Sequence, residues 1–147
     1  MKRSKAALRT MEPALEAKNL FHRDRAATFK KFAFDSDKTA KCTSTALAAA
    51  GFFSTATKDA PSSAKCPFCL KELEFDPEDD PWEEHRKRGQ TCEFVKLNKL
   101  DDKSWTVEET FRLANVCRVQ QNYEKQLGFM NDLQTSVTTN IDKLKLK

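Results

Sequence analysis

The sequence has little hydrophobic material and no long apolar run. Hydrophobic residues make up 39% of its 147 positions, and charged residues make up 33%. No stretch approaches the roughly 20 apolar residues of a membrane-spanning helix, and the N-terminus lacks the apolar core of a signal peptide. We therefore expect no membrane association, a small core with a highly solvated remainder, and a location in the cytoplasm or the nucleus.

A strong excess of charge of one sign is also missing. The formal net charge is +4, from 26 Lys and Arg against 22 Asp and Glu. Domains that bind DNA or RNA usually show a stronger basic excess. The composition therefore gives no indication of direct sequence-specific nucleic acid binding.

The chain lacks the residue patterns of catalysis as well. No nucleophile and base lie in a recognisable arrangement, so we expect a protein that is not an enzyme. After Cys92, only one further cysteine and no histidine follow. This excludes the second zinc cluster that a RING-type ubiquitin ligase needs.

What the sequence does contain is one cluster of metal-ligand residues. Cys66 and Cys69 are separated by two residues, and fifteen more lead to His85. Cys92 follows after another six. Two cysteines at this spacing can bind one ion from a single tight turn, and zinc prefers four nitrogen or sulfur ligands in a tetrahedron. The pattern predicts one structural Zn²⁺ ion.

Other interpretations of these residues are weaker. Cys66 and Cys69 are alternatively a redox pair or two buried thiols, but a thioredoxin-like site needs a βαβ context that the sequence lacks. A catalytic zinc keeps an open position for water, whereas three cysteines and one histidine fill all four positions. The closed structural site is therefore favoured.

The residues before His85 predict that this ligand lies on a short helix. Asp80 is a good N-cap, Pro81 suits the first helical position, and Glu83 follows three residues after the cap. Gly89 is expected to end the helix in the left-handed conformation, which returns the chain toward the metal. Cys92 then completes the site.

Short elements are expected in front of the zinc ligands. Asn19 is a candidate N-cap for a first helix, and an irregular segment with several phenylalanines follows it. Thr43 should cap a short alanine-rich helix that Gly51 ends. From Phe52 onward the pattern predicts a small antiparallel sheet of three short strands, with its second turn at the Cys66–Cys69 knuckle.

These residues together resemble the baculoviral inhibitor-of-apoptosis repeat, the BIR domain. The resemblance rests on Arg25-Ala-Ala-Thr28-Phe29, on Ala50-Gly51-Phe52, and on the zinc ligands with the run Asp79-Asp80-Pro81-Trp82 before His85. It implies an α+β fold: a small zinc-binding BIR domain at 19–103, with a three-stranded antiparallel sheet and short helices. A flexible basic arm at 1–18 precedes the domain, and a long C-terminal helix at 104–147 follows it.

The segment from Glu72 to Glu84 is acidic, with eight acids and no basic residue. One interpretation is a solvated surface with helix capping. The resemblance implies a cleft that binds a peptide through its free N-terminal alanine. Glu74 and Asp79 would hold the ammonium group, Leu73 and Phe75 would line a small apolar pocket, and two flanking cations, Lys71 and Arg88, would contact a phosphothreonine at the third residue of a histone tail.

The region after Leu100 predicts a long helix with one apolar stripe. No proline occurs after Pro81, and hydrophobic residues recur at heptad-like spacing. At 1.5 Å per residue, a helix of this length extends about 60 Å, so most of the stripe needs a partner unless the helix folds back onto its own domain. The stripe consists of Val116, Val119, Tyr123, Leu127, Met130, Leu133, Val137, Ile141 and Leu144.

One BIR domain followed by one long helix is similar to the survivin type of BIR protein. That resemblance implies a non-catalytic subunit of the chromosomal passenger complex, whose helix binds inner-centromere-protein-like and borealin-like subunits and so reaches Aurora B kinase indirectly. It implies action in chromosome segregation and cytokinesis, at the centromere, the spindle midzone, the nucleus and the cytoplasm. The alternative is an inhibitor of apoptosis whose groove binds caspases or their antagonists.

Overall fold

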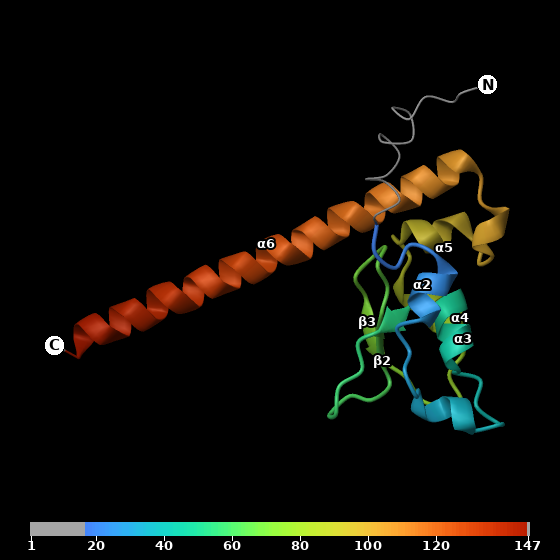
Figure 1. Cartoon of the computed structure of the whole chain (residues 1–147), viewed down its shortest axis with the longest axis horizontal. Helices are drawn as coiled ribbons and strands as arrows, with labels where there is room; N and C mark the ends of the chain where they lie inside the picture. The colour runs from blue at the N-terminus through green and yellow to red at the C-terminus, as the bar shows by residue number, and fades with distance from the viewer. Residues whose placement is uncertain (1–16, 147) are drawn as a thin grey trace.

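The computed structural model describes residues 17–146, so the predicted arm at 1–18 lies almost wholly outside the described residues. Figure 1 shows a small domain from which one long helix projects. None of the described helices is long and apolar enough to cross a membrane. The elements are, in order, α2 (His22–Ala26), η1 (Ala33–Ser36), α3 (Ser44–Ala49), β1 (Phe53–Ser54), β2 (Ser63–Lys65), β3 (Glu72–Glu74), α4 (Pro81–Arg88), α5 (Glu93–Leu97), η2 (Asp102–Ser104) and α6 (Val107–Lys145).

The sheet confirms the prediction of three short antiparallel strands. Its order is β1-β2-β3, with Phe53 opposite Lys65 and Ala64 opposite Leu73. The turn between β2 and β3 is the cysteine knuckle, where the Leu70 amide donates to the Cys66 carbonyl at 2.8 Å. Because β2 takes the central position, the knuckle lies at the end of the best-paired strand.

Two predictions about helix starts have different outcomes. The Thr43 hydroxyl accepts a hydrogen bond from the Ala46 amide and caps α3, and Gly51 follows that helix with φ +96°, as expected. Asn19, however, does not cap α2, because its own backbone is left-handed (φ 63°) and the N-cap position belongs to Phe21, which makes no side-chain cap. Asn19 instead turns the chain into α2.

Arg25 is buried in the core, where it connects segments that are far apart in sequence. Its Nε donates to the Ala48 carbonyl at 3.0 Å, and one terminal nitrogen donates to the Leu20 carbonyl. The guanidinium lies over the rings of Phe68 and Phe94, 5.8 and 5.5 Å from their centres. Burial lowers the pKa of Arg25 to about 10, so the group stays charged at neutral pH and holds α2 against α3.

The first half of α6 packs on the domain, and the second half does not. Leu113, Ala114 and Cys117 are buried, and Val116 is half-buried against the same core. Glu124 forms an ion pair with Lys65, and beyond it every described residue of α6 is exposed. The interpretation that the helix folds back onto its own domain is therefore correct for its first turns and wrong for the rest.

Val116 requires a correction as a consequence. Its partial burial against the core means that it supports the docking of α6, whereas the sequence assigned it to the partner stripe. Periodicity placed it there because heptad spacing continues from the free part of the helix into the docked part.

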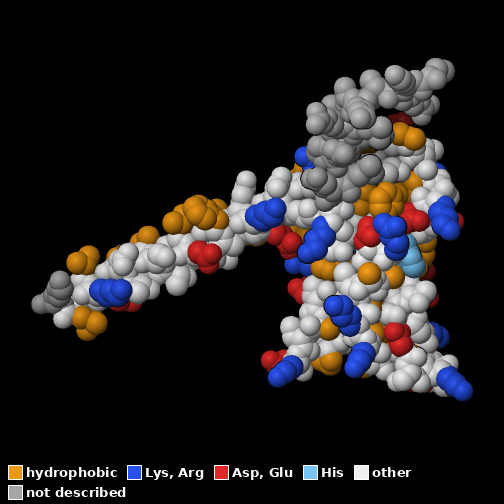
Figure 2. All heavy atoms as spheres, in the orientation of Figure 1, with side chains coloured by type: hydrophobic (Ala, Val, Ile, Leu, Met, Phe, Trp, Pro, Cys, Tyr) orange, Lys and Arg blue, Asp and Glu red, His pale blue; other side chains and the backbone are white. Residues whose placement is uncertain are grey.

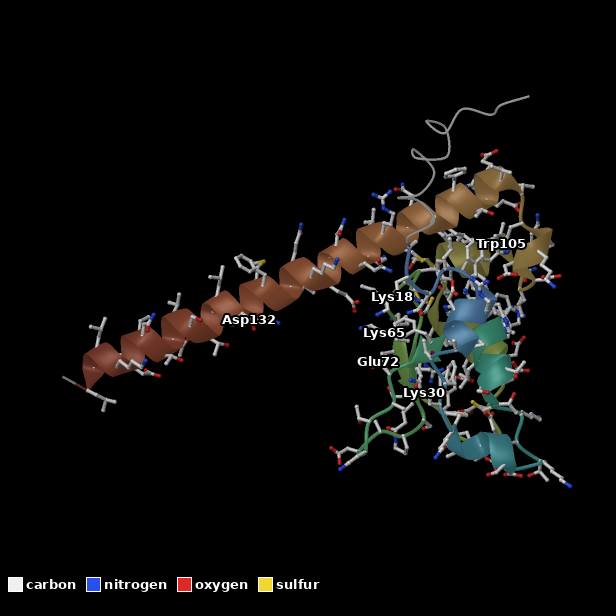
Figure 3. All side chains as sticks on the ribbon, viewed as in Figure 1. Lys18, Lys30, Lys65, Glu72, Trp105 and Asp132 are labelled. Atoms are coloured by element: carbon white, nitrogen blue, oxygen red, sulfur yellow. The ribbon has the colours of Figure 1, made fainter. Side chains whose placement is uncertain are left out.

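The segment between α5 and α6 is held by Trp105. Its Nε1 donates to the Lys99 carbonyl at 2.9 Å (Figure 3).

A matched pair of truncations should separate the two halves of α6. Leu113→Ala removes a side chain that is only 1% exposed and should cost about 2–5 kcal/mol of stability. Leu133→Ala makes the same chemical change at a residue that is 49% exposed and should cost less than about 0.5 kcal/mol. Urea unfolding in the presence of zinc measures both, and equal losses would contradict the docking described above.

Candidate metal centre and peptide-binding surface

The four predicted zinc ligands come together in space. One potential ligand atom from each of Cys66, Cys69, His85 and Cys92 lies within 4.8 Å of the others. The sulfurs of Cys66 and Cys92 are 3.9 Å apart, and the Cys69 sulfur lies 3.6 Å from His85 Nε2. Three thiols and one imidazole in this arrangement match a closed tetrahedral zinc site, and the prediction of a structural Zn²⁺ ion is confirmed.

The orientation of His85 is set by a backbone carbonyl. Its Nδ1 lies 2.7 Å from the Ala50 oxygen, and a carbonyl can only accept, so Nδ1 carries the proton. Nε2 is then left as the lone-pair nitrogen that faces the cysteines. Because Ala50 immediately follows α3, that helix holds the ligand in its metal-binding tautomer.

Cys66 and Cys69 lie in different environments, which shift the pKa values of their thiols in opposite directions. Burial raises the pKa of the Cys66 thiol well above its usual value. Hydrogen bonds from Cys66 and Cys92 lower the pKa of the Cys69 thiol. A zinc ion supplies the positive charge that allows all three thiols to ionise together.

The helix that carries His85 begins as predicted and ends differently. Asp80 Oδ1 accepts from the amides of Trp82 and Glu83, with Pro81 at the start of α4. Gly89 has φ −105°, so the expected left-handed ending is wrong. Glycine is needed for space instead, because a Cβ there would lie 2.8 Å from His85 Cδ2.

An aromatic layer that the sequence analysis did not identify surrounds the site. Phe94 stacks on His85 with ring centres 6.2 Å apart and on Phe68 at 5.0 Å. A Cβ on Gly51 would lie 2.8 Å from the Phe94 ring. In the sequence, only the position of Phe94 two residues after Cys92 indicates that its ring lies near the metal ligands. No sequence pattern marks the Ala50 carbonyl as the group that orients His85.

The two predicted ammonium ligands have different surroundings. Glu74 is exposed on β3, which is an edge strand of the described sheet. Asp79 is partly buried, and its Oδ2 accepts from the Asp76 amide at 2.8 Å. Asp79 therefore has a fixed position, with one oxygen committed to the turn before α4.

The predicted apolar wall is smaller than the sequence indicated. Leu73 is half-buried on β3, but Phe75 is only 3% exposed and packs edge-on against Phe52 at 5.2 Å. Phe75 thus belongs to the domain core. Of the two side chains, Leu73 alone presents substantial surface.

The two flanking cations also differ. Lys71 is exposed after the knuckle, whereas Arg88, in the last turn of α4, forms an ion pair with Glu84. Lys87 binds the same carboxylate at 2.8 Å, and these two cations lower the pKa of Glu84. A phosphate at Arg88 would have to compete with Glu84.

The apolar stripe of α6 is exposed beyond the docked turns, and Figure 2 shows hydrophobic side chains along one edge of the projecting helix. Exposed fractions range from 40% for Leu127 to 72% for Leu144. Phe129, 64% exposed, was missed because it lies off the heptad spacing, next to Met130. The other exposed stripe residues are Val119, Tyr123, Met130, Leu133, Val137 and Ile141.

A closed Cys₃His site clamping a three-stranded sheet, followed by one long helix, defines a small structural zinc module with a helical extension. A family model, the Inhibitor of Apoptosis domain (BIR), matches residues 25–96. Over 131 residues the chain is 46% identical to the chromosomal passenger complex protein bir-1 of Caenorhabditis elegans, covering 88% of the chain and 82% of bir-1. The chain belongs to the BIR family.

Other relatives are similar mainly through part of their length. The baculoviral IAP repeat-containing protein bir-2 of Caenorhabditis elegans is 51% identical over 110 residues, which are 75% of this chain and 36% of bir-2. The baculoviral IAP repeat-containing protein 5.1-A of Xenopus laevis is 42% identical over 110 residues, 74% of this chain and 66% of that protein. The chain thus spans about a third of bir-2 but most of bir-1.

Removal of zinc should unfold the domain, because the metal joins segments that the small core alone holds weakly. Trp82 and Trp105 both contact Phe94, with ring centres 5.9 and 6.2 Å apart. Their fluorescence should therefore report the collapse of the site when a chelator is added, and recovery when zinc is restored. Unchanged emission together with unchanged circular dichroism after verified zinc loss would contradict a structural role.

Gly89→Ala should weaken zinc retention, because the added Cβ displaces the His85 ring. We expect faster zinc loss to a colorimetric chelator and a destabilisation of about 1–3 kcal/mol. Gly128→Ala is the matched control, since a Cβ there meets nothing within 4 Å and should stabilise α6 by up to about 1 kcal/mol. Identical zinc-loss rates in both variants would show that Gly89 is not needed for space.

Proposed function

We propose that this chain is a non-catalytic subunit of a chromosomal passenger complex, acting at chromosomes and centromeres in segregation and cytokinesis. The observation that carries the proposal is the length of the match to bir-1. Its 131 residues exceed what the chain holds outside the 39-residue α6, so the similarity extends into the helix. A relative that shares only a BIR domain would not support the role of the helix.

The helix is proposed to bind other subunits through its exposed stripe. Eight large apolar side chains on one face remain accessible after the domain has packed, which is the pattern of an amphipathic helix that enters a bundle. Inner-centromere-protein-like and borealin-like helices are the proposed partners, and Aurora B kinase would be reached through them. The proposed locations are the centromere and later the spindle midzone, with a cytoplasmic pool.

The domain is proposed to bind the N-terminus of a histone tail along β3. An edge strand can accept an extended peptide as an additional strand, and β3 offers Glu74 on its exposed side. Asp79, held by the Asp76 amide, would fix the ammonium group. Lys71 and Arg88 would contact a phosphate on the third residue, and Leu73 would pack against the first.

An apoptotic role is the second candidate, supported by the description of the matching family as an inhibitor of apoptosis domain. Its ligand would also begin with a free alanine, held by the same acids, but would carry no phosphate. The two functions therefore differ in the need for Lys71 and Arg88. Phosphate dependence separates them.

The test is calorimetric binding of the peptide Ala-Arg-Thr-Lys, with and without phosphate on its threonine, to the zinc-bound protein. We expect binding that strengthens with phosphate by at least about tenfold, since charge-assisted pairs contribute about 1.5–3 kcal/mol. Arg88→Ala should remove most of the phosphate effect. Asp79→Asn should weaken both peptides while preserving the acceptor for the Asp76 amide.

The results of this experiment discriminate between the candidates. Equal affinity for the two peptides would contradict the phosphate contact and favour the apoptotic candidate. No binding of either peptide would contradict the peptide surface altogether. An acetylated peptide, which lacks the free ammonium, serves as the negative control.

A further inference from the structure

Arg25 has more donor groups than its described contacts use. The side chain is fully buried, at 0% exposure, and its Nε and Nη1 donate to the carbonyls of Ala48 and Leu20 at 3.0 and 2.5 Å. Its Nη2 is also buried but has no hydrogen-bond partner among residues 17–146. Because a buried charged donor is costly unless it is paired, this nitrogen indicates that an acceptor lies close to the guanidinium.

The guanidinium lies beside the metal ligands. It covers the rings of Phe68 and Phe94, and Phe94 stacks on the ligand His85. The backbone amide of Phe68 donates to the Cys66 sulfur at 3.4 Å. Arg25 therefore shares its nearest neighbours with two of the four zinc ligands.

The charged groups around Arg25 indicate which ligand it acts on. Burial lowers the pKa of Arg25 to about 10, and Cys66 opposes this shift most strongly, ahead of Asp102, Cys117 and Asp24. Asp102 and Asp24 are only half-buried and remain in contact with water, and Cys117 is not a metal ligand. Of these four groups, Cys66 is the one that becomes a buried anion when zinc binds.

The zinc site itself requires a cation nearby. Zn²⁺ with three thiolates and a neutral imidazole carries one net negative charge, and Cys66, Cys92 and His85 are at most 1% exposed. Water screens little of this charge, and a buried charge is costly without a partner. Among the residues that the structure describes, Arg25 is the only buried lysine or arginine.

We propose that Arg25 is the counter-ion of the zinc–thiolate centre, and that its Nη2 donates to the Cys66 sulfur in the metal-bound protein. Arg25 acts through Cys66 and is therefore a positioning residue. Its positive charge stabilises the ionised thiols, so the metal is bound more tightly. This inference goes beyond the proposed function and does not depend on it, because it concerns the metal centre alone.

The unaltered chain provides the first test. With ¹¹³Cd²⁺ in place of zinc, nuclear magnetic resonance should detect scalar coupling from the metal, across the Cys66 sulfur, to the Nη protons of Arg25. The amide proton of Phe68 is the internal control, because its hydrogen bond to the same sulfur is present in the structure. Coupling at the Phe68 amide without coupling at Arg25 would overturn the proposed contact.

Two substitutions test the charge itself. Arg25→Gln removes the charge but keeps a side-chain donor, whereas Arg25→Lys keeps the charge, and both lose the paired bonds to the Leu20 and Ala48 carbonyls. The glutamine variant should bind zinc about 10–100-fold more weakly than the lysine variant. A purely structural role of Arg25 predicts similar losses in both variants, and equal affinities would contradict the proposal.

A cobalt spectrum separates the charge effect from a loss of stability. With Co²⁺ in the site, the sulfur-to-metal charge-transfer band should move to longer wavelength in Arg25→Gln, because the thiolates lose a nearby cation, and should stay in place in Arg25→Lys. Leu113→Ala is the control, since it removes a buried, uncharged side chain of the same core and should leave the band unmoved. An unmoved band in Arg25→Gln, or the same shift in Leu113→Ala, would count against the proposal.

Discussion

The structure depends on the closure of one metal site by ligands from three separate parts of the chain. The knuckle supplies Cys66 and Cys69, α4 supplies His85, and Cys92 precedes α5. A core with this little apolar material cannot hold such short strands and helices together by burial alone. The metal, with the aromatic layer around Phe94, compensates for the small core.

The same site determines where the proposed peptide surface lies. The chain from β3 to α4 must span the distance between the knuckle and His85, and the acids occupy that span. Asp79 contributes to the turn through the Asp76 amide, so its structural role and its proposed binding role share one carboxylate. Arg88 also has an internal partner, because it forms an ion pair with Glu84 on the same helix. A ligand on this proposed surface would thus replace internal contacts.

The long helix is docked on the domain in its first half and exposed beyond it. Leu113, Ala114 and Cys117 attach its first turns to the domain, and the ion pair of Glu124 with Lys65 marks the end of that contact. The exposed stripe beyond it costs stability in water unless another helix covers it. A packed connection to the domain, followed by an exposed apolar face, would allow one chain to hold the proposed peptide-binding module at a defined place in a larger assembly.

The sequence alone determined the zinc ligands, the caps at Thr43 and Asp80, the three strands and the long helix, because these depend on spacing and on residues close in the chain. The tertiary structure decided what depends on distant contacts. It placed Phe75 and Val116 against the core, and it made Gly89 necessary for its lack of a side chain beside His85. It also recruited the Ala50 carbonyl as the orienting acceptor, since a backbone group carries no sequence signal and becomes a ligand support only when folding brings it there.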